Sequence, residues 1–312
     1  MTRLIALPLA AGLLSALLFL SVAKGIAFGV VLSYGAPLPV LMAGLGLGLG
    51  AAAAASIVGA AAVALVVGEY AILPFLVAVG LPGVVVANRA LLWRANPDGA
   101  AEWYPPGLVL AWLTAAGLAL ILIGAALVAG HPDGVEGWVG EALARAVEVA
   151  APVVDADSRA KLVEWWTPLL PAMVVGSWLL MAAVNSVGAQ ALLVRMGRNR
   201  RPSPAYRELW LPDWLGVVLA AAAAVGALAG GDAGYIAINV AVVSLVPFAF
   251  LGMAGIHGWA KGRANAGLIL AVAYGLLILA FGWAAVAAAG LGLVRFWKMR
   301  FRRGDSGGGE EG

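Results

Sequence analysis

A series of long, almost entirely apolar stretches divides this chain of 312 residues. A helix needs about 20 apolar residues to cross the ~30 Å hydrocarbon layer of a bilayer, so each stretch is a candidate transmembrane helix. The stretches are Leu4 to Ala23, Gly25 to Leu47, Ala51 to Val67, Ala71 to Leu92, Pro106 to Ala129, Leu169 to Val194, Trp214 to Ala229, Tyr235 to Ile256 and Ala266 to Val294. Only 11% of the residues are charged, against about 25% in a typical soluble domain. The sequence therefore predicts an all-α, polytopic transmembrane helical bundle.

The last stretch, Ala266 to Val294, allows two topologies. As one helix it would be about 44 Å long, which is longer than one span needs and short for two. Breaks at Gly282-Trp283 or at Gly290-Leu291-Gly292 would turn it into a re-entrant hairpin. We favour eight spans plus this C-terminal hairpin over nine spans, because the hairpin keeps the basic C-terminal tail on the same side as the other basic loops.

The distribution of basic residues predicts the orientation. Loops rich in Lys and Arg stay on the cytoplasmic side of a membrane. Fifteen of the nineteen basic residues fit one side: Arg3, Arg89, Arg94, five arginines between 195 and 207, Lys261, Arg263 and five residues between 295 and 303. The longest loop, 131–164, has a net charge of −4 and is predicted to be external. The C-terminus is accordingly predicted to be cytoplasmic.

The whole of residues 1–303 is predicted to be one membrane domain. Within the external loop, the stretch from Val135 to Ala150 has the periodicity of a short amphipathic helix, with Glu141 and Arg145 on one face. Residues 304–312 are rich in glycine and glutamate and are predicted to be a disordered cytoplasmic tail. Trp and Tyr residues near the predicted span ends, among them Trp93 and Trp103, are interpreted as anchors at the membrane interface.

Several classes of function have little support in the residue types present. The chain has no cysteine and only two histidines, His131 and His257, so thiolate chemistry, metal sites and cofactor ligands are not expected. No catalytic constellation occurs at membrane depth, which argues against an enzyme. The run from Gly44 to Gly50 lacks the third glycine and the lysine of phosphate-binding loops, so we interpret it as close helix packing or a bend. Short basic loops are explained by orientation and anionic headgroups, without nucleic acid.

A few polar residues near membrane depth are the candidates for a binding site. Ionisable groups are costly there, and Lys24, Glu69 and Asp232 lie between predicted spans on the predicted outer side. They can be helix ends at the interface, or Lys24 and Glu69 can close a polar pocket for a solute. A second, neutral group can be either interhelical hydrogen bonds or a pocket. Its members are Ser177, Asn185, Ser186, Gln190 and Asn239.

The order of certain short motifs resembles a known family. The chain has Pro37-Leu38-Pro39 before a glycine-rich turn, a span containing Asn239, Gly255-Ile256-His257 before a basic loop, and a closing Leu291-Gly292-Leu293-Val294-Arg295-Phe296-Trp297. This pattern resembles the YybS-like family of predicted bacterial membrane proteins, domain of unknown function 2232. The resemblance implies an acid at the position of Arg295, so we expect this chain to depart from the family there. The resemblance implies a multi-pass protein of the bacterial cytoplasmic (inner) membrane.

The resemblance supplies two functional hypotheses but no activity. The family is similar at the level of hydropathy to the substrate-binding subunits of energy-coupling-factor transporters. The first hypothesis is therefore a solute-binding transport subunit that depends on cytoplasmic coupling ATPases, with Lys24, Glu69, Asn185 and Asn239 as its candidate polar pocket. The alternative is a non-enzymatic membrane scaffold or assembly factor for the cell envelope, whose external loop binds another protein.

Overall fold

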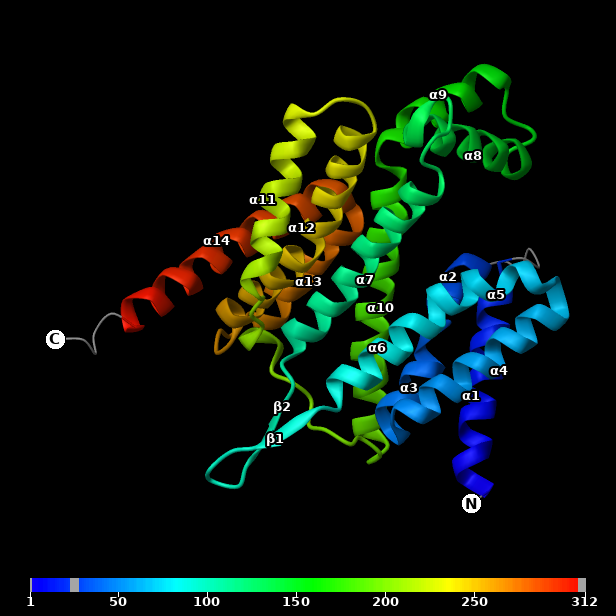
Figure 1. Ribbon diagram of the computed structural model, residues 1–312. Coiled ribbons are helices and arrows are strands. Elements are labelled where there is room, and N and C mark those ends of the chain that lie inside the picture. Colours follow the sequence, from blue (N-terminus) through cyan, green and yellow to red (C-terminus); the bar gives the residue numbers. More distant parts are fainter. Residues whose placement is uncertain (1, 23–27, 308–312) are drawn as a thin grey trace. The chain divides into compact units, whose positions relative to one another are not determined.

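The computed structural model describes residues 2–22 and 28–307 (Figure 1). Most of this part of the chain is helical. The α-helices are α1 Thr2–Leu20, α2 Gly29–Tyr34, α3 Pro37–Leu47, α4 Leu49–Val67, α5 Ile72–Phe75, α6 Leu81–Ala90, α7 Pro106–Leu127, α8 Gly134–Ala150, α9 Ala156–Trp166, α10 Leu170–Arg195, α11 Asp213–Leu228, α12 Gly231–Ala260, α13 Ala266–Leu279 and α14 Phe281–Gly307. Short helices of other types are η1 Glu69–Ala71, the π-helix η2 Leu76–Gly80, η3 Thr167–Leu169 and η4 Tyr206–Glu208.

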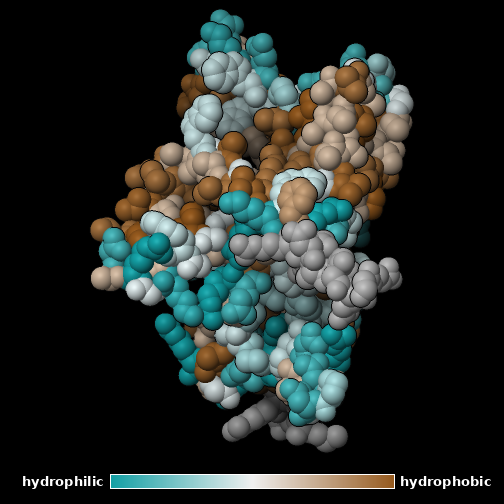
Figure 2. Space-filling model, turned by 90° about the vertical axis from the view of Figure 1, so that its left-hand side faces the viewer, coloured by the Kyte–Doolittle hydropathy of each residue, from teal (hydrophilic) through white to brown (hydrophobic). Residues whose placement is uncertain are grey.

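The predicted polytopic helical bundle is confirmed. Within the described residues, six helical segments are long and apolar enough to cross a membrane, and three further apolar helices are shorter. Together they correspond to the nine apolar stretches of the sequence. The six are Gly29–Leu47, Leu49–Val67, Glu69–Ala90, Pro106–Leu127, Ala156–Arg195 and Gly231–Ala260, and the three are Ala6–Leu20, Asp213–Leu228 and Ala266–Leu279. Figure 2 shows broad hydrophobic areas on the face that it displays, as expected of a surface that contacts lipid.

The chain divides into two compact units, and the single membrane domain stays a prediction. Unit 1 consists of residues 1–113 and 178–205, and unit 2 consists of residues 114–177 and 206–312. The division falls inside α7 and inside α10, so each of these helices belongs partly to both units.

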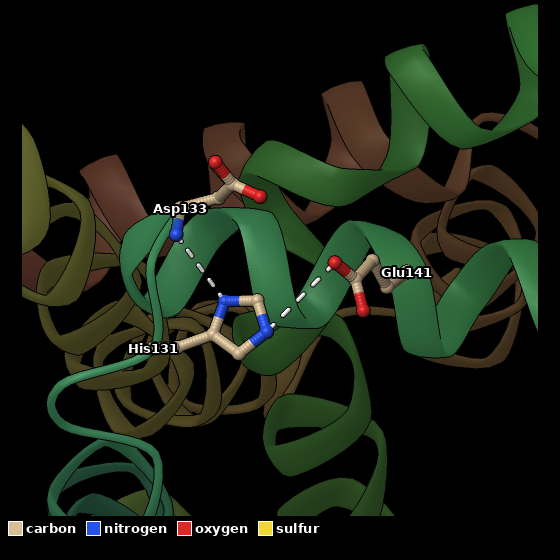
Figure 3. Close-up of side chains that lie close together, drawn as sticks. All are labelled: His131, Asp133 and Glu141. Atoms are coloured by element: carbon tan, nitrogen blue, oxygen red, sulfur yellow. Dashed lines mark hydrogen bonds and ion pairs between the residues drawn. The ribbon is translucent and has the colours of Figure 1, made fainter.

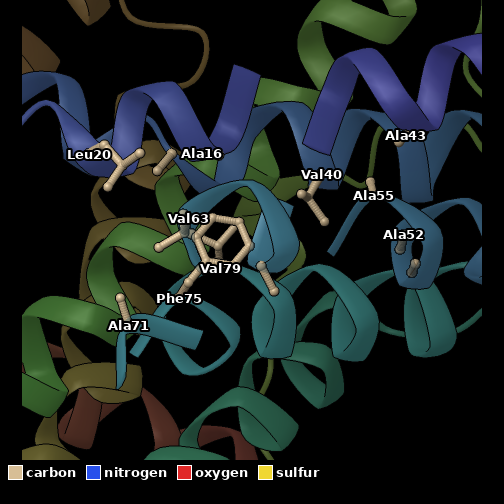
Figure 4. Close-up of a cluster of buried hydrophobic side chains, with 13 residues drawn as sticks. Ala16, Leu20, Val40, Ala43, Ala52, Ala55, Val63, Ala71, Phe75 and Val79 are labelled. Atoms are coloured by element: carbon tan, nitrogen blue, oxygen red, sulfur yellow. The ribbon is translucent and has the colours of Figure 1, made fainter. Parts of the chain in front are cut away.

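The core of unit 1 forms around Phe75. Its ring packs edge-on against Phe19 of α1, with 5.4 Å between ring centroids, and Figure 4 shows Val63 and Val79 beside it. Gly44 of the glycine-rich run lies so close to Ala52 and Ala87 that a side chain there would collide with both. Gly48, with a φ of 112°, makes the turn from α3 to α4. Both interpretations of this run, close packing and a bend, are therefore confirmed.

The core of unit 2 depends on a close contact of α12 with α14. A Cβ at Gly292 would meet the carbonyl of Phe248, and one at Gly252 would meet the carbonyl of Ala288. Next to this contact, the buried ring of Phe248 packs edge-on against Phe296, with 5.3 Å between centroids. Gly292 is therefore a packing residue within α14.

The last apolar stretch does divide into two helices, but not at the expected residues. The break lies at Ala280, between α13 and α14, while Gly282, Gly290 and Gly292 are all helical. Gly292 packs against the backbone of α12, and a continuous helix keeps it in that contact. α14 also continues through Gly307, so residues 304–307 of the predicted disordered tail are helical, and residues 308–312 lie outside the described residues.

The predicted external loop contains two helices. The predicted amphipathic helix is confirmed as α8, Gly134–Ala150. The second helix, α9, is an addition to the prediction. It begins where the carboxylate of Asp155 accepts a hydrogen bond from the amide of Ser158, at 2.9 Å, a typical N-cap.

A small β-hairpin is a further element that the sequence analysis misses. Strands β1, Trp93–Ala95, and β2, Ala101–Trp103, pair antiparallel with Trp93 opposite Trp103. The turn Asn96-Pro97-Asp98-Gly99 closes with a hydrogen bond from the Gly99 amide to the Asn96 carbonyl, at 2.9 Å, and Gly99 has a φ of 80°. Pro-Asp-Gly is a recognised turn signal. The interpretation of Trp93 and Trp103 as interface anchors does not predict that they pair across a hairpin.

Candidate functional site

The structure does not bring the ionisable candidates Glu69 and Asp232 together. Lys24 lies outside the described residues, so its predicted pairing with Glu69 stays a prediction. Glu69 begins η1 and is exposed, and its side chain makes no hydrogen bond or ion pair with any residue that the structure describes. Asp232, in the first turn of α12, accepts a hydrogen bond from the amide of Val135 at 2.8 Å. It thereby caps the start of α8, which is a helix-end role.

The polar residues of α10 in unit 1 bind backbone carbonyl groups. The amide nitrogen of Asn185 donates to the carbonyls of Tyr34, at 2.7 Å, and Met181, at 2.8 Å. Ser186 donates to the carbonyl of Ala182 in its own helix, at 2.6 Å. The bond to Tyr34 joins α10 to the end of α2, which is the interhelical role that the sequence predicts as the alternative to a pocket, whereas the other two bonds lie within α10.

Asn239 of unit 2 is fully buried, and both the oxygen and the nitrogen of its side-chain amide are hydrogen-bonded. Its Oδ1 accepts from the amide of Ala172 at 2.8 Å, and its Nδ2 donates to the carbonyls of Pro168 and Tyr235, each at 3.0 Å. Ala172 lies in the first turn of α10, where amides lack helical partners. Asn239 therefore fastens α12 to the start of α10, and none of these bonds links it to Glu69 or Asn185, which belong to unit 1.

His131, Asp133 and Glu141 gather at the start of α8, with their potential metal ligands within 4.8 Å of one another (Figure 3). The amide of Asp133 donates to Nδ1 of His131 at 3.4 Å, and Nε2 faces a Glu141 oxygen at 3.8 Å. These contacts place the His131 ring between the backbone of Asp133 and the carboxylate of Glu141, and the N-cap residue Asp133 makes no side-chain capping bond to α8.

A groove runs between α8 and α9, with a volume of ≈ 490 Å³. Its lining is mostly small and apolar, with two carboxylates and one guanidinium. The lining includes Ala144, Glu148, Arg159, Ala160, Val163 and Glu164. Large apolar side chains stand exposed on the same two helices and the turn between them: Val149 is 83% exposed, Val153 95% and Trp165 82%.

Arg201, one of the five arginines that predict orientation, is buried in the structure. Its side chain is in the interior of unit 1, where Nη1 donates to the carbonyls of Ala90, at 2.8 Å, and Tyr104, at 3.3 Å. Its own carbonyl accepts from the buried Gln190, at 2.9 Å. Burial lowers the pKa of the Arg201 guanidinium, which still stays charged because the ordinary value is so high. No pattern in the sequence distinguishes it from the four arginines around it.

Comparison with known families assigns the chain to one of them. The family described as "Predicted membrane protein (DUF2232)" matches residues 13–294, which is most of the sequence. The chain belongs to the DUF2232 family. The match begins within α1 and ends within α14, so it covers both units. No curated protein and no solved structure matches the chain.

Membership of the DUF2232 family agrees with the apolar helices in defining a multi-pass membrane protein. The matched region stops just before Arg295. Arg295 donates to the carbonyls of Leu251 and Arg207, both in unit 2.

Proposed function

We propose that this DUF2232 protein is a non-enzymatic membrane scaffold or assembly factor for the cell envelope, which binds another protein through α8 and α9. The observation that carries the proposal is the exposure of Val149, Val153 and Trp165 on these helices. They lie in the loop 131–164 or directly after it, in the segment that charge predicts to be external. Val149 and Val153 lie between the candidate spans Pro106–Leu127 and Ala156–Arg195, and Trp165 lies near the start of the second one. Exposed apolar side chains in and beside such a loop are typical of an interaction surface.

The groove between α8 and α9 suggests the chemistry of the partner. Small apolar residues line it, and Glu148 and Glu164 are both exposed. The net charge of −4 in loop 131–164 disfavours contact with anionic headgroups and favours a basic protein. The proposed partner therefore presents an apolar segment flanked by Lys or Arg.

The contacts of the polar candidates favour a scaffold over a solute-binding transport subunit with coupling ATPases. Asn185 and Asn239 each donate twice to backbone carbonyls, which leaves no amide hydrogen of either side chain for a solute. The proposed location is a bacterial cytoplasmic membrane, with the C-terminus in the cytoplasm and α8 and α9 outside.

The test is crosslinking in cells. A photoreactive amino acid placed at Val149 or at Val153 is expected to capture an envelope protein, and the same group at Val217, an exposed residue of the apolar helix α11, is not. Val153→Asp is expected to reduce capture from position 149. Equal capture from position 217, or no capture from either loop position, would contradict the proposal.

Purification from native membranes separates the two functions. Mass spectrometry of co-purifying proteins and small molecules is expected to recover the crosslinked envelope protein. Recovery of an ATPase pair, or of a metabolite in stoichiometric amount, would contradict the scaffold proposal and support a transport subunit.

A further inference from the structure

Arg201 carries a positive charge that no acid in the described part of the chain offsets. The residue is 6% exposed, and its Nη1 donates to two carbonyl groups rather than to carboxylates. Its Nε is buried without any hydrogen-bond partner. Nη2 likewise donates to no residue that the structure describes. Burial of a cation without a counter-charge is strongly unfavourable, so a group of this kind normally marks the place of an anion.

The surroundings of Arg201 are cationic. Arg198 and Arg200 are exposed next to it in sequence, and Nη1 of Arg200 donates to the carbonyl of Leu47 at 3.0 Å, which holds this loop against the end of α3. Glu102 in the adjoining hairpin is already paired with Arg94 at 2.7 Å. The excess of positive charge thus remains for a ligand from outside the chain.

Aromatic rings place this end of unit 1 at the depth of the lipid headgroups. The guanidinium of Arg201 lies 5.7 Å from the centroid of Trp103, and that of Arg89 lies 4.0 Å from the centroid of Trp112. Trp93, opposite Trp103 in the hairpin, is largely exposed. Tryptophan favours the membrane interface, where its ring contacts both chain and headgroup.

We propose that this end of unit 1 binds the phosphate of an anionic phospholipid headgroup, with Arg201 as the central ligand. The site is formed by the loop 196–205, the end of α6 and the β-hairpin. A guanidinium donates to phosphate oxygens through fixed N–H groups, and Arg198 and Arg200 add to the attraction. Basic clusters at the cytoplasmic ends of membrane helices bind anionic headgroups by this chemistry, and charge predicts that this loop is cytoplasmic.

The experiment measures lipid binding to the purified full chain in detergent by native mass spectrometry. The wild-type protein is expected to bind phosphatidylglycerol more tightly than phosphatidylcholine. Arg201→Gln is expected to weaken phosphatidylglycerol binding about tenfold, because a charge-assisted hydrogen bond is lost. The matched control is Arg263→Gln, which removes an exposed arginine that lies over Trp259 in another basic loop, and it is expected to change binding less than about twofold.

Equal binding of the two lipids by the wild type would overturn the proposal, as would equal losses in the two variants. If Arg201→Gln does not fold, Arg200→Gln replaces it, because Arg200 is exposed and its loss removes a neighbouring charge. It is expected to weaken phosphatidylglycerol binding more than Arg263→Gln does. Protection against thermal unfolding by inorganic phosphate alone, at the level given by the lipid, would identify a free phosphate site instead.

Discussion

The indole nitrogen of Trp178 donates a 3.0 Å hydrogen bond to the carbonyl of Val77, 101 positions earlier in the chain. Val77 lies in the π-helix η2, where the amide of Leu81 bonds to the carbonyl of Leu76, five residues back. The next amide in this pattern belongs to position 82, which is proline and has no N–H to give to Val77. Trp178 supplies the missing donor, and thereby joins α10 to the interrupted span within unit 1.

Trp178→Phe is expected to lower the free energy of unfolding by about 1 to 3 kcal/mol, because it leaves the Val77 carbonyl without a donor in an apolar setting. Thermal or denaturant unfolding in detergent measures the change. Trp112→Phe is the matched control, since its indole bonds to the Tyr104 hydroxyl at a more exposed position, where water or headgroups can replace the bond. An equal effect of both substitutions would contradict the role of Trp178.

Asn239→Leu is expected to destabilise unit 2 by about 1 to 3 kcal/mol. The substitution keeps the approximate size of the side chain but leaves the Ala172 amide and the Pro168 carbonyl without their partner in α12. Ser244→Ala is the control in the same helix, because the Ser244 hydroxyl is also fully buried but bonds only to the Val240 carbonyl one turn back. If Ser244→Ala lowers the free energy of unfolding as much as Asn239→Leu does, the interhelical bonds of Asn239 add no stability beyond that of a bond within one helix.

Gly292→Ala is expected to cost about 1 to 3 kcal/mol, because its new methyl group meets the backbone of Phe248 and Gly252, which cannot rotate away. Gly290→Ala, in the same helix, places its methyl group in open space and is expected to be neutral or stabilising. The comparison by thermal unfolding tests the close contact of α12 and α14. Tolerance of both substitutions would rule out that contact.

The start of α9 is expected to depend on pH through Asp155. The hydrogen bond from the Ser158 amide holds the pKa of this carboxyl below its usual range. The carboxylate cap is therefore fully present above the ordinary Asp pKa of about 3.9 and is lost as the pH falls through the lowered value.

Hydrogen exchange at the Ser158 amide measures this dependence, with protection expected to decrease on acidification. Asp155→Asn keeps a capping oxygen but does not titrate in this range, so its protection is expected to stay level. A pH response of equal size in the Asn variant would assign the effect to another group.

The secondary structure was predictable where local rules govern it. Apolar runs of span length gave the helices, and the period of charges from Val135 to Ala150 gave α8, because these patterns depend on neighbours along the chain. The β-hairpin carried a readable signal in Pro97-Asp98-Gly99, and α9 carried one in Asp155. Both signals are short and local, and composition alone does not reveal them, because they depend on turn and cap chemistry.

The candidate site was less predictable, because polarity in a sequence does not show what a side chain bonds to. Asn239 is an outlier in an apolar run whether it binds a solute or the backbone of another helix. Only the position of Ala172 and Pro168 beside Asn239 reveals that it binds the backbone of another helix. The burial of Arg201 had no signal in the sequence, since the carbonyls of Ala90 and Tyr104 that hold it are about 100 positions away.

The sequence by itself determined that this chain is a helical, multi-pass membrane protein of the DUF2232 family, because the bilayer imposes length and apolarity on every span and both are local properties. The tertiary structure alone decided which polar groups are engaged: Trp178 with Val77, Asn239 with α10, and Arg201 with the hairpin. In an apolar medium each such group must find a partner, and that partner is brought near by packing between helices, not by distance along the chain.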